Sequence, residues 1–201
     1  MSSRSTLPSA ILALLSERPM HPYRIQQCIR RRNKHEVINV SQRAALYQAI
    51  RRLEREGLIR AQSVSRDEKR PERTTYELTD AGRADVAAWL RKGLSSPLKE
   101  FPEFPAVLSF LEHLTPAEAL LGLQKRIEAL EAEETRLGRD YEEYLKQVPR
   151  LFLVESEYLI AVCRAEKVWV ESIVSDIEAG RLVWSAESIK AIRAKLPDAE
   201  G

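Results

Sequence analysis

The chain has 201 residues, of which 44% are hydrophobic and 31% are charged, and this is enough apolar material for one larger core or two smaller ones. Its apolar stretches fall far short of the roughly 20 residues that span a bilayer, and Glu17 and Arg18 interrupt the apolar patch near the N-terminus. We therefore expect neither a membrane helix nor a signal peptide. Two distant cysteines and three scattered histidines argue against a disulfide scaffold and a zinc site. The composition favours a reduced, cytoplasmic protein without a metal or another cofactor.

The net charge of +2 conceals two halves of opposite sign. Residues 1–93 hold nineteen basic and ten acidic side chains, a net charge of +9, whereas the remaining residues sum to −7. Because a basic excess attracts polyanions, binding to a nucleic acid is expected in the first part of the chain only.

Three helices are expected before residue 57. The first covers residues 7–16, where apolar side chains recur at helical spacing. A second starts near His21 and ends in three arginines, whose simplest role is to complement the negative end of the helix dipole. A third covers residues 41–56, with Ser41 as its N-cap and Gly57 as its stop.

Two β-prone runs, residues 58–64 and 74–78, follow the third helix and flank the charged tip SRDEKRPER. Thr79 then caps a fourth helix over residues 80–92. Residues 93–105 contain three prolines and two serines and are expected to form a linker, although their phenylalanines should pack on the helices that follow. Helices followed by a glycine, a strand, a charged hairpin and a second strand predict a winged helix-turn-helix.

Long helices dominate the second half. We expect one over residues 115–148, another with a wide apolar face over residues 151–177, and a short one over residues 185–196. The first contains an apolar heptad repeat that predicts a dimerisation seam. The seam consists of Leu123, Leu130, Leu137 and Tyr144. Apolar faces this wide need cover, which a second copy of the chain would supply; a bundle within one chain is the alternative.

The third helix has two chemically different edges. At about 100° per residue its leucines and isoleucine fall on one side and its arginines on the other. Arginine bonds guanine or phosphate and glutamine bonds adenine, so such a helix suits the major groove of DNA. The predicted DNA-contacting residues are Gln42, Arg43, Tyr47, Gln48, Arg51, Arg52 and Arg55. A solvated basic face is the simpler alternative, which the preceding helix and the following hairpin oppose.

The charged tip between the two strands supplies a second predicted contact. Lys69, Arg70 and Arg73 are basic residues that could bind a phosphate or enter the minor groove. Acidic residues stand beside them, and the alternative is an ordinary exposed hairpin that does not contact DNA.

Three segments, AILALLSERPMHPYRIQQCI, LYQAIRRLEREGLI and TTYELTDAGR, occur in this order across nearly all of residues 10–83. Together they resemble the PadR family of transcriptional regulators, and the C-terminal part is similar in length to the subgroup with a larger helical domain. The resemblance implies a homodimeric repressor that binds an inverted-repeat operator. It also implies release from that operator when a small molecule binds, often a phenolic or drug-like one.

Two positions depart from the pattern of that family. Pro22 stands where the family usually has glycine after a histidine, and proline is acceptable in the first turn of a helix. Ala44 and Ala45 stand where glycine and threonine are common, and alanine cannot donate a hydrogen bond from its side chain. The base preference of relatives is therefore not transferable, and Tyr47 and the arginines must carry more of the contact.

Effector binding is predicted at aromatic residues between the two domains, with core packing as the alternative that their helical spacing favours. These residues are Trp89, Phe152, Tyr158 and Trp169. Of the two cysteines, Cys28 lies in an apolar helical pattern typical of an inert thiol. Cys163, which precedes Arg164, is the better candidate for a redox sensor, although a buried inert thiol is the simpler expectation there too.

The sequence therefore predicts a mainly α protein with a small β-wing. Residues 1–93 are expected to form a winged helix-turn-helix DNA-binding domain, and residues 94–201 a helical dimerisation domain that also senses an effector. The expected partners are double-stranded operator DNA, a second copy of the chain and a small aromatic or drug-like effector. A winged-helix protein-interaction module and an activator without an inducer are the alternatives. No catalytic arrangement of residues stands out, so an enzyme is not expected.

Overall fold

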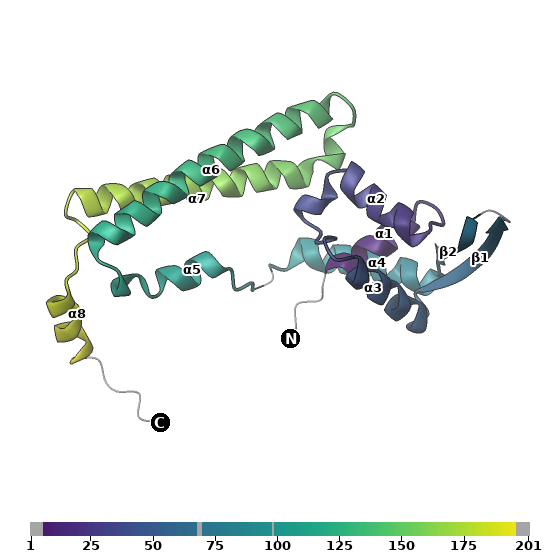
Figure 1. Cartoon of the computed structure of the whole chain (residues 1–201), viewed down its shortest axis with the longest axis horizontal. Coiled ribbons are helices and arrows are strands. Elements are labelled where there is room, and N and C mark those ends of the chain that lie inside the picture. Colours follow the sequence, from purple (N-terminus) through teal and green to yellow (C-terminus); the bar gives the residue numbers. More distant parts are fainter. Residues whose placement is uncertain (1–5, 68–69, 98, 196–201) are drawn as a thin grey trace. The chain divides into compact units, whose positions relative to one another are not determined.

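The computed structural model describes residues 6–67, 70–97 and 99–195, and of residues 63–67 and 70–73 it describes the backbone. The chain divides into two compact units, the first ending at Lys99 and the second beginning at Glu100 (Figure 1). This division falls within the proline-containing segment that the sequence suggested as a linker. The chain is mainly helical with one two-stranded antiparallel sheet, so the predicted fold class is confirmed.

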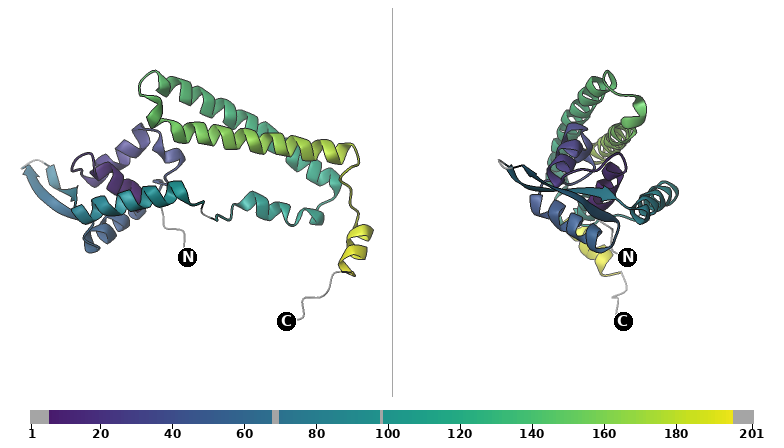
Figure 2. Two further views of the ribbon diagram at one scale, coloured as in Figure 1. Left: turned by 180° about the vertical axis from the view of Figure 1, so that it is seen from behind. Right: turned by 90° about the vertical axis from the view of Figure 1, so that its right-hand side faces the viewer.

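The first unit contains the helix-turn-helix and the wing. Its elements are α1 (Thr6–Leu15), α2 (Pro22–Arg31), the 3-10 turn η1 (Lys34–Glu36), α3 (Arg43–Arg55), β1 (Ile59–Asp67), β2 (Arg70–Leu78) and α4 (Asp80–Ser95). The helices cluster together, and the hairpin of β1 and β2 extends away from them (Figures 1 and 2). The helices lie close to their predicted ranges because each has an apolar edge at helical spacing.

A single apolar core holds the helices of this unit together. Ile11 and Leu12 of α1, Ile25 of α2, and Ile50 of α3 are among its fully buried side chains. Burying a side chain of this size stabilises the fold by about 1.5–3 kcal/mol. This core leaves the opposite sides of α2 and α3 exposed, and polar and charged residues lie there.

The wing is longer than the sequence suggested. The two strands pair in antiparallel register from Ile59 opposite Leu78 to Asp67 opposite Arg70, with irregularities near Gln62 and Arg66. The prediction that SRDEKRPER forms the tip is therefore wrong for most of its length, because backbone pairing continues through those charged residues. Met20 adds a bridge to the sheet, since its amide nitrogen and carbonyl oxygen bond those of Tyr76 at 2.9 and 3.0 Å.

Thr79 ties the wing to the helices. Its hydroxyl accepts a hydrogen bond from the amide of Gly82, which caps α4, and lies 2.8 and 3.0 Å from the carbonyl oxygens of Gly57 and Leu58. Gly57 has a φ of 71°, a conformation that favours glycine. The predicted cap at Thr79 and the predicted stop at Gly57 are both confirmed.

Substituting Gly82 with alanine should destabilise the first unit. A Cβ atom at this position would lie 2.1 Å from the Leu58 carbonyl oxygen and 2.7 Å from Leu78 Cδ1, so backbone would have to move. We expect a loss of about 1–3 kcal/mol, measured by hydrogen exchange of the α1 and α3 amides. Gly93, on the same helix, has nothing within 4 Å of such an atom. Gly93→Ala should therefore stabilise the helix, and equal effects of the two changes would contradict the packing described.

The second unit is entirely helical in its described residues. Its elements are α5 (Glu103–Leu108), the 3-10 turn η2 (Leu111–His113), α6 (Pro116–Leu145), the 3-10 turn η3 (Arg150–Phe152), α7 (Val154–Glu178) and α8 (Ala186–Arg193). Thr115 and Glu118 form a capping box at the start of α6, and Ser185 caps α8. The predicted linker is shorter than expected, because α4 continues to Ser95 and α5 begins at Glu103.

Helices α6 and α7 form an antiparallel hairpin. Arg126 pairs with Glu166 at 2.5 Å, and Glu134 pairs with both Arg164 and Lys167 at 2.5 and 3.1 Å. These pairs are partly exposed, so they define the register of the hairpin more than they stabilise it. The stability comes from the apolar residues between the helices.

The heptad seam packs within the chain. Leu123 is 5% exposed and clusters with Val170 and Val174 of α7, and Leu137 is 6% exposed. Leu130 packs against the same cluster, and Tyr144 is half-buried. The seam therefore serves as the intrachain contact with α7, which was the alternative to a dimer seam, because α7 presents a matching apolar face.

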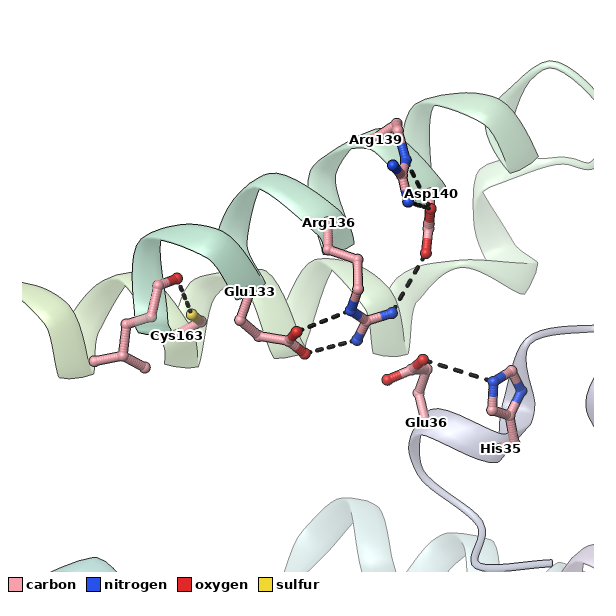
Figure 3. Close-up of polar contacts among 8 residues, drawn as sticks. His35, Glu36, Glu133, Arg136, Arg139, Asp140 and Cys163 are labelled. Atoms are coloured by element: carbon pink, nitrogen blue, oxygen red, sulfur yellow. Dashed lines mark hydrogen bonds and ion pairs between the residues drawn. The ribbon is translucent and has the colours of Figure 1, made fainter. Parts of the chain in front are cut away.

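Polar contacts along the hairpin are drawn in Figure 3. Arg136 lies between Glu133 and Asp140 of its own helix, at 2.6 and 3.4 Å. The Cys163 thiol is buried and donates to the Leu130 carbonyl oxygen at 3.4 Å. Burial, reinforced by the Glu134 charge, raises the pKa of Cys163. A raised pKa disfavours the reactive thiolate, so the structure supports an inert thiol at this position.

A polar cluster closes the turn between α6 and α7. Arg150 Nε and Nη2 donate to the two carboxylate oxygens of Glu157 at 2.7 and 2.8 Å, and the Tyr141 hydroxyl donates to Glu157 at 2.9 Å. The hydrogen bonds from Arg150, followed by that from Tyr141, lower the pKa of Glu157 to about 2. The cluster joins the last turns of α6, η3 and the first turn of α7.

Replacing Glu157 with glutamine should lower the melting temperature of the second unit in a pH-dependent way. A carboxyl group with a depressed pKa in the folded state stabilises the fold above its ordinary pKa and loses that contribution as pH falls. The deficit of Glu157→Gln should therefore be full at pH 7 and shrink between about pH 5 and about pH 2, as measured by thermal unfolding. Glu171→Gln, at an exposed position of α7, is the control and should show no such trend.

Candidate nucleic-acid interface

Helix α3 turns its apolar edge inward and its basic edge outward. Leu46, Ile50 and Leu53 are buried where α3 packs on α1 and α2. On the opposite edge Gln48, Arg51 and Arg55 are exposed together with Ala44. The helix is 13 residues long, and an α-helix of this size fits the major groove of DNA. The structure therefore places three of the predicted DNA-contacting residues on one exposed face.

The N-terminus of α3 differs from the prediction. Gln42, not Ser41, is the N-cap, and its side chain makes no capping hydrogen bond. Ser41 is engaged elsewhere, because its amide and hydroxyl both donate to the Asn39 side-chain oxygen at 3.1 and 2.7 Å. Gln42 and Arg43 are both exposed, so both are available at the end of the helix that recognition helices direct toward bases.

Tyr47 lies on the flank of this face, next to the wing. It is half-buried, and the neighbouring Tyr76 of β2 is also half-buried. Burial, followed by the nearby charge of Glu54, raises the pKa of Tyr76, while Arg51 acts in the opposite direction. Tyr47, Arg51, Glu54 and Tyr76 are thus near neighbours, and the wing supports one side of the exposed face.

Arg52 sits apart from the other predicted contacts. Its Nε donates to Glu56 at 2.8 Å, and this hydrogen bond raises the pKa of the arginine. Arg52 and Glu56 also line a small cleft with Pro8 of α1 and Asp85 of α4. Arg52 therefore lies at the edge where α3 meets the other helices, with its charge compensated.

The arginines at the end of α2 also differ in whether an acidic residue compensates their charge. Arg32 pairs with Glu17 through two hydrogen bonds, one of them 2.7 Å long, and thereby links the end of α2 to the end of α1. Arg30 and Arg31 are exposed and add to the basic surface of the unit. From the sequence, the only role predicted for these arginines was to complement the helix dipole. The pairing with Glu17 could not be predicted, because Glu17 lies beyond the helix that carries the arginines.

The predicted wing contacts are Lys69, Arg70 and Arg73. Lys69 is outside the described residues. Arg70 and Arg73 stand on β2, at register positions opposite Asp67 and Ser65 of β1. Both positions are close to the end of the hairpin that lies opposite its junctions with α3 and α4.

The predicted effector residues are distributed over both units. Trp89 is half-buried on α4 in the first unit. Phe152 and Tyr158 are 56% and 67% exposed on η3 and α7. Trp169 packs edge-to-face on Phe104 of α5, with ring centroids 6.2 Å apart. Within the second unit, Tyr158 and Trp169 belong to the outer face of α7.

In the ranges 6–67, 70–97 and 99–195 no cluster of three or more histidine, cysteine or acidic residues could hold a metal ion. Over the same part of the chain, no helix combines the length and the apolar character needed to cross a membrane.

A helix-turn-helix followed by a two-stranded wing, with a basic exposed edge on its last helix, defines the winged helix-turn-helix class. Residues 11–88 match the Transcriptional regulator PadR-like family. The first unit therefore contains a PadR-like domain, as the three sequence segments implied. No curated protein sequence matches the chain.

Solved structures share the fold over most of the chain. Bacillus subtilis PadR in complex with operator DNA is 22% identical, with a TM-score of 0.69 over 88% of this chain and 99% of that one. Bacillus subtilis PadR in complex with p-coumaric acid is 21% identical, with a TM-score of 0.71 over 86% and 99%. The Vibrio cholerae virulence activator AphA is 19% identical, with a TM-score of 0.64 over 86% and 98%.

Proposed function

We propose that this protein is a homodimeric transcriptional regulator that binds a specific DNA sequence through α3. The observation that carries the proposal is the exposed face of α3, where Gln48, Arg51 and Arg55 lie opposite the buried edge of the helix. The charge of +9 over residues 1–93 supports it, because basic surfaces bind the phosphate backbone. We propose no catalytic role, and we propose that the protein acts in the cytoplasm.

The outer face of α7 supports pairing of two chains. Its members are uncharged and all exposed: Val154, Tyr158, Ala161, Val162, Ala165, Val168, Trp169 and Ser172. They follow one side of a 25-residue helix whose other side packs on α6. An apolar surface this long marks an interaction site in a soluble protein. A second α7 would cover it with an identical surface, as twofold symmetry requires.

Pairing would give the DNA contact its specificity. One recognition helix reads a few base pairs, so a single α3 covers only half of a typical operator. Two copies would place two α3 helices about one turn of DNA apart, on an inverted repeat. The similar structure of Bacillus subtilis PadR was solved with operator DNA, which supports this use of the fold.

We further propose that the protein represses transcription and leaves its operator when a small molecule binds. The complex of Bacillus subtilis PadR with p-coumaric acid supports such an effector. AphA is described as a virulence activator, so the same fold also serves activation. A reporter gene placed behind the selected operator distinguishes the two, since deletion of a repressor raises expression and deletion of an activator lowers it.

Substituting Arg51 with alanine should weaken binding to a selected duplex by about 1–3 kcal/mol if this arginine reads a base. The measurement is a gel shift on duplexes enriched from a random pool, repeated at rising salt. Arg52→Ala is the matched control and should cost less, because Glu56 already compensates the charge of Arg52. An equal loss on all sequences would assign Arg51 to a phosphate contact.

The same experiment tests the main alternative. A winged-helix module that binds another protein would show no salt-sensitive binding to any duplex. That result would overturn the proposal, whatever the effect of the single substitutions.

Substituting Val162 with glutamate should convert the dimer to a monomer. The new carboxylate would lie in the middle of the apolar face of α7, where pairing would remove it from water at a cost of several kcal/mol. Sedimentation velocity should then report the mass of one chain. Ala129→Glu, at an exposed position of α6, introduces the same charge and should leave the dimer intact. A dimer that survives Val162→Glu would exclude this face as the interface.

A further inference from the structure

A pocket lies within the second unit, between α5, η2 and the first half of α6. Its volume is about 390 Å³, within the range of small-molecule sites. Its lining is mostly apolar and includes Phe104, Val107, Leu108, Leu111, Leu114 and Leu123. None of the four aromatic residues predicted as effector contacts lines it, so it is a separate site.

Two charged residues also line the pocket, and they differ in how they are compensated. Arg126 donates from Nε to Glu166 at 2.6 Å, and its guanidinium lies 3.4 Å from the centroid of the Phe104 ring. The positive charge is therefore balanced by a carboxylate and by an aromatic face. Glu103 is exposed and has no ion-pair partner among the residues that the structure describes. The uncompensated charge at the pocket is negative.

We propose that this pocket binds an apolar organic cation. The apolar body would displace water from the leucine and valine side chains, and the positive charge would lie near the Glu103 carboxylate, which attracts it. An anion of the same shape would be repelled by Glu103 and would have to compete with Glu166 for Arg126. The role of the pocket as an effector site rests on the proposed function as a DNA-binding regulator. Binding of the cation itself does not depend on that function.

Two tryptophan side chains provide a fluorescence signal for binding at this pocket. Phe104 packs edge-to-face on Trp169, with the ring planes at 80°, and Trp184 Nε1 donates to the Leu114 carbonyl oxygen at 2.7 Å. Two of the three tryptophans in the chain thus contact residues that line the pocket. Occupation of the pocket should change their fluorescence.

Gly122 allows the pocket to be filled without strain. It lines the pocket, and a Cβ atom at this position would meet nothing within 4 Å. A leucine side chain at position 122 could therefore fill the pocket without a clash at its Cβ atom. Gly138, also on α6, has the same freedom and does not line the pocket. Gly122→Leu and Gly138→Leu form a matched pair.

The test titrates the full-length protein, without DNA, with tetraphenylphosphonium and with tetraphenylborate, which have nearly the same size and opposite charge. Binding is followed by tryptophan fluorescence and by calorimetry. We expect saturable binding of the phosphonium, at least about tenfold tighter than that of the borate, which is about 1.4 kcal/mol. Gly122→Leu should weaken phosphonium binding at least about tenfold, and Gly138→Leu should leave it unchanged. Glu103→Gln should remove most of the preference for the cation.

Three results would overturn the proposal. The first is phosphonium binding that Gly122→Leu does not affect, and the second is a preference for the cation that survives Glu103→Gln. The third is an absence of phosphonium binding; dissociation of the dimer by Gly122→Leu alone would in that case show that a second copy of the chain covers the pocket. Because DNA is absent throughout, none of these outcomes depends on whether the protein binds an operator.

Discussion

Burial of Leu46, Ile50 and Leu53 against α1 and α2 determines the rotation of α3 about its own axis, and the candidate interface depends on that rotation. Each of these side chains contributes about 1.5–3 kcal/mol when removed from water, so the helix cannot turn without losing much of the core. With the apolar edge inward, Gln48 and Arg51 necessarily face outward. The wing then supports one flank of the same face through Tyr76, and the Thr79 contacts hold the wing against the turn after α3.

The second unit solves a different packing problem. Its two long helices, α6 and α7, pack against each other through one face each. The heptad seam of α6 lies in that contact. The outer face of α7 is left apolar and exposed from Val154 to Trp169, while the interhelix ion pairs define the register at little gain in stability. The proposed contact with a polyanion thus falls on the basic first unit, and the proposed pairing of chains falls on the uncovered face of the acidic second unit.

Much of the fold follows from local patterns. Thr79 caps a helix as the sequence predicted, and the helices predicted to begin near Thr115 and Ser185 are capped by those residues, because a cap depends on neighbours within four residues. Other features depend on partners far away in the chain and were missed or misplaced. Ser41 is engaged by Asn39 and does not cap α3, and the wing strands continue through charged residues because their backbones can pair. Within the candidate site, Gln48, Arg51 and Arg55 lie as helical periodicity indicated. Arg52 is exposed as well and pairs with Glu56, and its contact with DNA stays a prediction.

The sequence by itself determined the helices, the glycine stop after α3, the wing, the separation of charge between the two halves and the resemblance to PadR regulators, because all of these depend on residue type and short spacing. Only the tertiary structure decided which of several apolar faces is covered within the chain and which is left open. It also decided that Arg126 is compensated and Glu103 is not. The physical reason is that Glu166 and Phe104, the groups that compensate Arg126, belong to two other helices, and no pattern along the chain specifies how those helices meet.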